Sequence, residues 1–370
     1  MTKLRFLTAG ESHGPCLTAI VDGFPAGIVI DTAEIDRELS RRQGGYGRGK
    51  RMQIERDRVE ILAGVINGKT TGAPIALRIE NRDWANWREH WEAGDLPPLT
   101  VPRPGHADYA GMIKYGLPDA RPILERASAR ETAARVAIGA LAKQLFAQFA
   151  VRIGSYVQQI GAVKAHIPDI SPEDLCKLAE SSDVRCPDPE AATLMHSEID
   201  AARTAGDTLG GVFVVIATGV PVGLGSHVQW DRRIDALLAQ ALVSIPAVKG
   251  AEIGDAFENT SKSGREVHDE LFPNGEGVRR VTNRAGGIEG GMTNGAPILV
   301  RAAVKPIPTM IAPLRSVDLA TGGAALTEYQ RSDVCVVPAA AVVGEAMVAW
   351  ILADALIEKY GGDSLAEMVR

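Results

Sequence analysis

A chain of 370 residues with 45% hydrophobic and 23% charged side chains has the composition of a globular protein, and it can bury a large core without disulfides or structural metal. Its formal net charge of −6 provides no overall attraction for nucleic acid or any other polyanion. Aromatic residues make up only 5% of the chain, so we expect a core of Ala, Val, Ile and Leu.

The cysteines and the apolar segments indicate where the protein resides. Four scattered cysteines form no CxxC pair and no cluster at zinc spacing, which is typical of free thiols in a reducing compartment and predicts no metal site. The N-terminus lacks the apolar stretch of a signal peptide. The best candidate for a membrane span starts at Pro338, but it contains Glu345 and Asp354 and ends at Gly361, which favours a buried helix with a glycine C-cap. We expect a cytoplasmic protein without a membrane partner.

Local patterns predict the elements in chain order. Alternating or β-branched runs predict strands at 3–8, 17–21, 59–62, 75–79, 151–163, 211–218 and 297–305. Helical patterns occur at 32–43, 128–149, 172–181, 189–205, 232–242 and 338–360. The first two helices start with Asp31 and Ser128, each followed three residues later by a glutamate (Glu34 and Glu131) at capping-box spacing. Because strands and helices do not alternate as βαβ units, we predict an α+β fold.

Several glycine-rich or irregular stretches are too long to be plain connections. They lie at 44–51, 81–109, 259–283, 283–297 and 306–330. Long structureless segments in a compact chain are usually functional, so the chemistry is expected there.

The segment 41–51, RRQGGYGRGKR, has five cations and no acid. It nearly matches a phosphate-binding loop, but it follows a helix and has Arg51 where that loop needs Ser or Thr, which excludes a nucleotide triphosphatase. Three interpretations remain open. The segment is a solvated loop, an arginine-glycine segment that binds RNA, or a site where Arg42, Arg48 and Arg51 converge on a phosphate or carboxylate.

Two histidines lie in turns. The loop VPRPGHADY presents His106 next to Arg103 and Asp108, an arrangement that suits a general acid near an anionic substrate; two metal ligands are the alternative, but a third is missing. The turn GESHG does not match the GxSxG pattern of hydrolases, so His13 is interpreted as an acid or an anion contact. A structural role for either histidine remains possible on local grounds.

Two further motifs indicate ligands. Arg126 and Arg130 flank Ser128 where a helix begins, although the helix dipole is already positive there; an anion at this end would relieve the repulsion. The run NRAGGIEGGMTNGAP, at 283–297, has five glycines that allow close approach of the backbone to a flat ligand.

Taken together and in order, these blocks resemble the chorismate synthase family from about Thr8 to near the C-terminus. The blocks are GESHG, RRQGGYGRG, RPGHADY, ERASARETAARVAIGA, VKGAEIGDAF, NRAGGIEGGMTNG, KPIPT and QRSDVC. The resemblance implies a single domain spanning 1–370, with antiparallel sheets layered around helices, assembled as a homotetramer. It also implies a lyase of the shikimate pathway that converts 5-enolpyruvylshikimate 3-phosphate to chorismate and phosphate. This reaction is an anti 1,4-elimination without net redox change, yet it uses reduced FMN.

The resemblance also implies roles for individual residues. His13 would protonate the departing phosphate, His106 would protonate reduced flavin near N1, and Asp333 would help N5 accept the C6 hydrogen. The anions of the substrate would bind Ser12, Arg42, Arg48, Arg51, Arg103 and Arg130. The flavin would bind Arg126, Ala127, Ser128, Pro246, Ala247, Gly290, Lys305, Pro306, Ile307, Pro308, Thr309 and Arg331.

The resemblance also bears on the reductant, and two alternative functions remain open. NADPH could contact Arg42 and Arg48, but no segment marks a built-in reductase, so an external flavin reductase is expected to supply reduced FMN. A flavin oxidoreductase that carries out net hydride transfer is the main rival. An RNA-binding protein is the second rival, although we expect no nucleic-acid partner.

Overall fold

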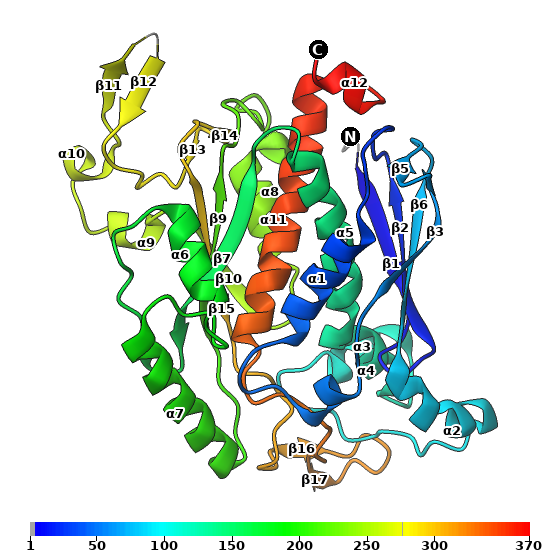
Figure 1. The fold of residues 1–370 in the computed structure, drawn as a ribbon. Coiled ribbons are helices and arrows are strands. Elements are labelled where there is room, and N and C mark those ends of the chain that lie inside the picture. The colour runs from blue at the N-terminus through cyan, green and yellow to red at the C-terminus, as the bar shows by residue number, and fades with distance from the viewer. Residues whose placement is uncertain (1–3, 276) are drawn as a thin grey trace.

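Two antiparallel sheets enclose a layer of helices in the computed structural model, which describes residues 4–275 and 277–370 (Figure 1). The central helices are α1 (Thr32–Gln43), α5 (Thr132–Phe146), α8 (Ile234–Val243) and α11 (Val337–Tyr360). One cluster of buried residues, mainly Ala, Val, Ile and Leu, draws on the helices and on both sheets. The predicted α+β class and the layered arrangement are confirmed.

The smaller sheet covers α5 on one side of this layer (Figure 1). Its strands, in spatial order, are β1 (Arg5–Ala9), β2 (Cys16–Asp22), β6 (Ile75–Glu80) and β3 (Val59–Ala63). Alternate residues of β2 and β6 are buried, as their sequence pattern predicts. The turn that carries His13 is the connection between β1 and β2, so the pairing of these strands positions it.

The larger sheet covers α11 on the other side. Its order is β10 (Val248–Ile253), β15 (Ile298–Val304), β9 (Gly211–Thr218), β7 (Arg152–Ile160) and β8 (Val163–Lys164). The central strand β9 is apolar on both faces because α11 covers one face and α6 (Pro172–Glu180) lies over the other.

Helix α11 is long and apolar enough to cross a membrane, but 89% of its most apolar window is buried inside the protein. It packs against α5, α8, α1 and both β7 and β9, which explains why it is hydrophobic on all sides. A side chain at Gly139 of α5 would place its Cβ only 2.3 Å from that of Ala346, so glycine permits this close crossing with α11. The expected buried helix ending at a C-terminal glycine is confirmed.

The remaining elements are short, apart from α7. The other helices are α2 (Arg88–Ala93), α3 (Asp108–Tyr115), α4 (Arg121–Ala127), α7 (Pro189–Ala205), α9 (Ala256–Asn259), α10 (Gly264–Val267) and α12 (Leu365–Met368), with 3₁₀ turns at Lys50–Gln53, Arg82–Asn86, Ala129–Glu131 and Trp230–Arg232. The other strands are β4 (Val65–Ile66), β5 (Lys69–Thr70), β11 (Leu271–Asn274), β12 (Gly277–Arg280), β13 (Ile288–Glu289), β14 (Met292–Thr293), β16 (Arg315–Val317) and β17 (Ala324–Leu326).

The two predicted capping boxes are only half correct. Asp31 caps α1 by accepting the N–H of Ala33, and the Ser128 hydroxyl accepts the N–H of Arg130 at a 3₁₀ turn that precedes α5. Neither glutamate completes its box. Glu34 pairs with Arg37, and Glu131 accepts hydrogen bonds from Thr8 and Arg135.

A buried ionic cluster holds the helical layer together away from the site described below. We define the Glu345 cluster as Glu345, Arg41, Lys143, Arg185 and Ser155. The Glu345 carboxylate has no exposed surface and lies 2.8 Å from Arg41, 2.6 Å from Lys143, 3.1 Å from Arg185 and 2.5 Å from the Ser155 hydroxyl. Burial opposes its ionisation, but Lys143 and Arg41 outweigh burial and hold the pKa of Glu345 well below its ordinary value.

Glu180, which borders this cluster, predicts how the free energy of unfolding changes at acid pH. Burial opposes its ionisation, but hydrogen bonds from Arg41 and Arg185 lower the pKa of Glu180 from 4.5 to about 2. A depressed pKa stabilises the fold above the unfolded value, so the free energy of unfolding should be level above pH 4.5 and fall as the pH drops toward 2. Urea denaturation at a series of pH values measures this. A level profile down to pH 2 would contradict it, and Glu180→Gln should make the decline shallower.

Candidate active site

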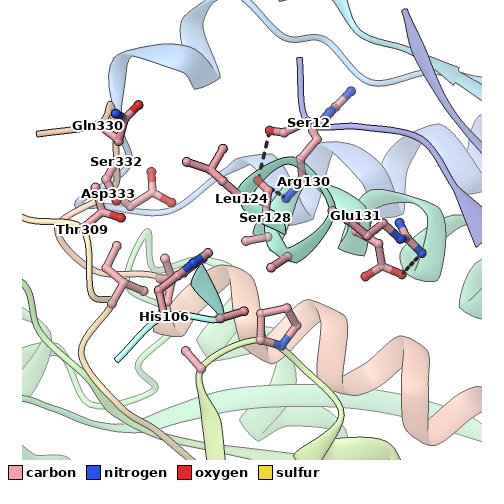
Figure 2. A pocket seen from close by; sticks show the side chains of 18 of the residues that line it. Ser12, His106, Leu124, Ser128, Arg130, Glu131, Thr309, Gln330, Ser332 and Asp333 are labelled. Carbon is pink, nitrogen blue, oxygen red and sulfur yellow. Dashed lines mark hydrogen bonds and ion pairs between the residues drawn. The ribbon is translucent and has the colours of Figure 1, made fainter. Parts of the chain in front are cut away.

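A cavity of about 1110 Å³ lies where α4, the start of α5 and the segment before α11 come together. Its walls come from distant parts of the chain, including the β1–β2 turn, the loop after α1, the loop before α3 and the segment after β15. Figure 2 shows Asp333 and Thr309 on one side, Ser12 and Ser128 on the opposite side, and His106 facing the space between them. Segments that are far apart in sequence therefore share one site.

The cavity brings together all but two of the residues singled out from the sequence. The lining includes Ser12, His13, Arg42, Arg48, Arg51, Arg103, His106, Arg126, Ala127, Ser128, Arg130, Pro246, Ala247, Lys305, Ile307, Pro308, Thr309, Arg331 and Asp333. Pro306 is not among the lining residues, although both of its neighbours are.

Gly290 lies elsewhere, which differs from the expectation. It forms the turn between β13 and β14 in a left-handed conformation, with open space at its Cβ position, whereas the next residue, Gly291, packs against Ser226 and Arg233. In Figure 1 this hairpin is at one end of the larger sheet, and α4 and β16 are at the other. Most of the glycine-rich run 283–297 is used for this tight local packing; a Cβ at Gly286 would meet the backbone of Gly254 at 2.4 Å. Within one chain this run does not reach the cavity.

His13 is held by a buried carboxylate. Glu125, on α4, accepts the backbone N–H of His13 at 2.7 Å, and its other oxygen lies 2.8 Å from the ring Nδ1. The Trp87 ring packs on the imidazole at a centroid distance of 4.2 Å. These contacts fix the ring at the edge of the cavity, with 16% of its side chain exposed.

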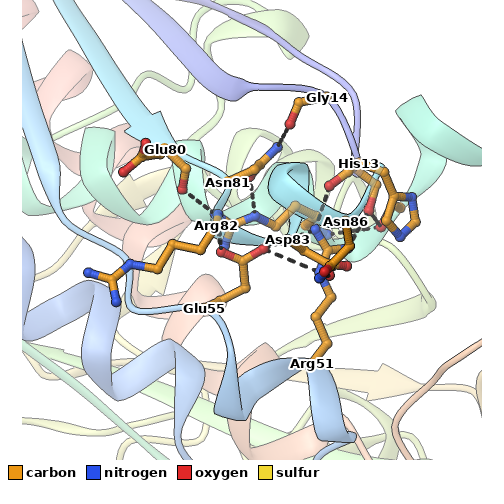
Figure 3. A network of polar contacts seen from close by, with 12 residues as sticks. His13, Gly14, Arg51, Glu55, Glu80, Asn81, Arg82, Asp83 and Asn86 are labelled. Carbon is orange, nitrogen blue, oxygen red and sulfur yellow. Dashed lines mark hydrogen bonds and ion pairs between the residues drawn. The ribbon is translucent and has the colours of Figure 1, made fainter. Parts of the chain in front are cut away.

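Two serines and an arginine form the neighbouring wall. The hydroxyls of Ser12 and Ser128 lie 3.0 Å apart, and Ser12 also accepts a 2.7 Å hydrogen bond from Arg51. Arg51 contacts Glu55 at 3.2 Å and Asp83 at 3.8 Å, and Figure 3 shows these groups and Asn81 around the turn of His13. Burial is the largest effect on Arg51 and lowers its pKa. The network fixes the position of the guanidinium without covering it.

Arg130 and Arg42 lie deeper. Arg130 forms two hydrogen bonds to Asp57, at 2.6 and 2.7 Å, and another to Asn81 at 2.8 Å. Arg42 donates to the carbonyl of Ala129 and to Thr132. Burial lowers the pKa of Arg42 to about 9, and the nearby charge of Arg130 adds to this effect. Arg42 and Arg130 share Asp57, and Arg130 also lies 3.7 Å from Glu55.

His106 belongs to a second histidine–carboxylate pair. Its Nδ1 lies 2.5 Å from Asp108, which also accepts a 2.8 Å hydrogen bond from Arg103. Burial opposes ionisation of Asp108, but hydrogen bonds from His106 and Arg103 hold its pKa well below the ordinary value. Arg103 also donates to Thr309 at 2.8 Å, which joins this loop to the segment after β15.

Asp333 faces the basic loop. It accepts hydrogen bonds from Arg48 at 2.8 Å and from the backbone N–H of Gly49 at 2.6 Å. The Nε atom of Arg48 and the Nη1 atom of Arg42 are both buried, and neither has a hydrogen-bond partner among the described residues. Buried donors without acceptors are uncommon; the Nη1 atom of Arg42 lies 3.7 Å from the Asp57 carboxylate.

The basic segment 41–51 is therefore not a free cationic surface. Arg41 points into the Glu345 cluster, whereas Arg42, Arg48 and Arg51 line the cavity. The structure favours convergence on a small anion over contact with RNA. The side chain of Lys50 lies outside the described residues.

Sequence reasoning missed the acidic partners of these cations. Glu125, Asp57 and Glu55 were not singled out, because nothing local distinguishes a buried acid from a solvated one. The one available signal was the position of Glu125 directly before Arg126 in the ERASARE block.

Comparisons with known proteins agree with this geometry. The sequence profile of the chorismate synthase family matches residues 4–357. The chain belongs to the chorismate synthase family. Chorismate synthase from Desulforudis audaxviator is 56% identical, with 99% of this chain and 95% of the relative covered. The enzyme from Chlorobaculum tepidum is 54% identical, with 99% and 96% covered. A crystal structure of a chorismate synthase superposes with a TM-score of 0.81 at 46% identity, covering 99% of this chain and 95% of that one.

Membership in the chorismate synthase family establishes the reaction. The chain is a carbon–oxygen lyase (EC 4.2.3.5) of the shikimate pathway that eliminates phosphate from 5-enolpyruvylshikimate 3-phosphate to give chorismate. Chorismate synthases depend on a flavin. The RNA-binding and net-hydride-transfer interpretations are not supported.

Proposed function

We propose that the cavity binds reduced FMN together with the substrate, and that its arginines hold the phosphate and the two carboxylates. The observation that carries the proposal is the convergence of Arg42, Arg48, Arg51, Arg103 and Arg130 on one cavity in a protein of net charge −6. Planar guanidinium groups bind such oxyanions with paired hydrogen bonds.

The cavity also fits a flavin. Its lining combines the cations with apolar groups that suit a planar ring, including Leu124, Ile307, Pro308 and Met347. Thr309 and Lys305 bring polar contacts to the same wall, and Ala247 takes a left-handed conformation (φ 69°) where it lines the cavity. We propose that Arg126, Ala127, Ser128, Pro246, Ala247, Arg331 and the segment 305–309 hold FMN. Reduced FMN would lend electron density to the reacting allylic system and recover it.

The residues of the chain perform the remaining steps. Cleavage of the carbon–oxygen bond places negative charge on the departing phosphate. Arg51 and Arg130 would stabilise this charge, and Ser12 would contact the phosphate. His13 would donate a proton to that phosphate. His106, oriented by Asp108, would hold a proton near N1 of the flavin, and Asp333 would assist removal of the C6 hydrogen. Because most of these groups are buried, their fields act through little water.

Several properties of the assembled enzyme belong to the same proposal. We expect a homotetramer in the cytoplasm that receives reduced FMN from a separate reductase, so NADPH would not be required directly. We also propose that the whole chain forms one domain, since a single core cluster includes residues of both sheets.

Anaerobic stopped-flow absorbance tests the function. Photoreduced FMN and the phosphorylated substrate are mixed with the enzyme while flavin absorbance and phosphate release are followed. A transient flavin signal is expected, with many equivalents of phosphate released per flavin. Consumption of one reductant per product would instead indicate net redox chemistry and would contradict the proposal.

Arg48→Ala should weaken substrate binding by roughly ten- to a hundredfold, since a hydrogen bond to a charged group contributes about 1.5–3 kcal/mol. The turnover number should fall less. Isothermal titration with the substrate and oxidised FMN measures the affinity. Arg58→Ala, at an exposed arginine outside the lining, is the matched control. Unchanged affinity in the Arg48 variant would remove this residue from the anion site.

A further inference from the structure

We propose that Glu125 is the positioning residue of His13, which fixes both the orientation of the imidazole and the nitrogen that carries its exchangeable proton. The inference rests on the proposed function, in which His13 donates a proton to the departing phosphate. Glu125 itself does not touch the reacting atoms in this proposal, because it acts through the ring.

The geometry leaves one arrangement of hydrogens. The carboxylate of Glu125 receives two contacts from the same residue, the backbone N–H at 2.7 Å and Nδ1 at 2.8 Å. A buried carboxylate accepts hydrogen bonds, so the hydrogen must reside on Nδ1. The other ring nitrogen, Nε2, has no hydrogen-bond partner among the described residues and is therefore the one left for exchange. Trp87 packs on the face of the ring, which prevents it from rotating away from Glu125.

Glu125 differs from the other buried acids around the cavity. Asp57, Glu55, Asp83 and Asp108 each form an ion pair with at least one arginine. The Glu125 side chain is only 1% exposed, and His13 is its sole ion-pair partner within the described parts of the chain. A buried charge without a counter-charge is unfavourable. The pair is electrically neutral when the ring carries hydrogens on both nitrogens, which is the form that can donate from Nε2.

The same geometry predicts what an amide would do. Glu125→Gln keeps the size of the side chain but supplies one acceptor where the carboxylate supplies two. The backbone N–H of His13 cannot lose its hydrogen, so the amide oxygen should face it and the amide N–H should face Nδ1. A ring in that environment carries its hydrogen on Nε2, and donation from Nε2 would then create an imidazolate. An imidazole held in the wrong tautomer loses its catalytic role even when its position is preserved.

The test compares histidine tautomers and kinetics in the full-length enzyme. Solid-state ¹⁵N NMR of protein labelled with [¹⁵N]histidine reports whether Nδ1 carries hydrogen, and the His13 signals are assigned by their loss in His13→Asn. In the wild-type enzyme Nδ1 should carry hydrogen, and in Glu125→Gln it should not. The turnover number of Glu125→Gln should fall by about 10²-fold or more, within the range that a general acid contributes, while KM changes little.

Glu38→Gln is the matched control, because Glu38 is also a buried glutamate but lies outside the cavity. It should retain the wild-type tautomer and turnover. Wild-type turnover in Glu125→Gln would overturn the proposal. So would a wild-type His13 whose Nδ1 carries no hydrogen, a result that does not depend on whether Glu125→Gln folds. Because the NMR signal does not depend on turnover, failure of the proposed function would be seen separately, in the stopped-flow experiment.

Discussion

Replacing either His13 or His106 by alanine is expected to reduce the turnover number by roughly 10²- to 10⁴-fold, the range that a general acid contributes. Both imidazoles line the same cavity, and each is oriented by a buried carboxylate. The two losses have different origins in the proposed mechanism. In that mechanism His13 would protonate the departing phosphate, whereas His106 would set the charge of the flavin.

Single-turnover stopped-flow separates these origins. His13→Ala should slow phosphate release at all flavin concentrations, and His106→Ala should also alter the spectrum of the bound reduced flavin. His90→Ala is the control, since His90 lies on α2 with 64% of its side chain exposed and outside the cavity. Circular dichroism should show intact folding in all three variants. Rates close to wild type in both His13→Ala and His106→Ala would contradict their assigned roles.

Glu345→Gln should lower the free energy of unfolding by about 3–5 kcal/mol, as expected when one partner of a buried ionic network is removed. The substitution retains the shape of the side chain, so packing of α11 is preserved. Among the residues that the structure describes, Arg41, Lys143 and Arg185 would then keep only Glu38 and Glu180 as acidic partners. An excess of buried positive charge would remain among α1, α5 and β7.

Guanidinium chloride denaturation at a fixed protein concentration measures this loss. Glu92→Gln serves as a control because Glu92 pairs with Arg88 on the exposed helix α2, where a change should stay within about 0.5 kcal/mol. The turnover number of the folded Glu345→Gln enzyme should not change, since the Glu345 cluster lies outside the cavity. A loss below about 1 kcal/mol would contradict a cooperative role for the network.

Elements with strong local patterns could be predicted from the sequence. The strand at 211–218 and the helix at 189–205 have the bounds that their patterns predict, and most of the other predicted elements differ by only one or two residues at each end. β10 was missed. Its sequence VKGAEI contains Gly250 and two charges, so it lacks a clear alternation, and it forms because β15 pairs with it from fifty residues away.

The capping boxes show a related limit. Glu34 and Glu131 have the right spacing, but other residues compete for both carboxylates: Arg37 of the same helix pairs with Glu34, and Thr8 and Arg135 donate to Glu131. The expectation that long irregular segments are functional holds for some of them and not for others. Parts of 44–51 and 306–330 line the cavity, whereas 259–283 forms α10 and the β11–β12 hairpin away from it.

The cations of the site were predictable, and their acidic partners were not. The arginines that line the cavity belong to recognisable sequence blocks, as Arg48 and Arg130 do. The role of an acid such as Asp57 or Glu125 becomes visible only in the fold, because the fold buries it next to a cation or a histidine. Gly290 lies outside the cavity of its own chain, although other glycines of the same block are used for tight backbone packing.

The position of α11 has a consequence for biosynthesis. About 190 residues separate the end of α5 at Phe146 from the start of α11 at Val337, although the two helices pack together. At a translation rate of roughly 5–20 residues per second, α11 is synthesised about 10–40 seconds after α5, so the apolar surface of α5 stays uncovered by α11 during that time. During that interval the nascent chain exposes surface that binds holding chaperones, and a ribosome that stalls before residue 337 releases a product unable to close its own interior.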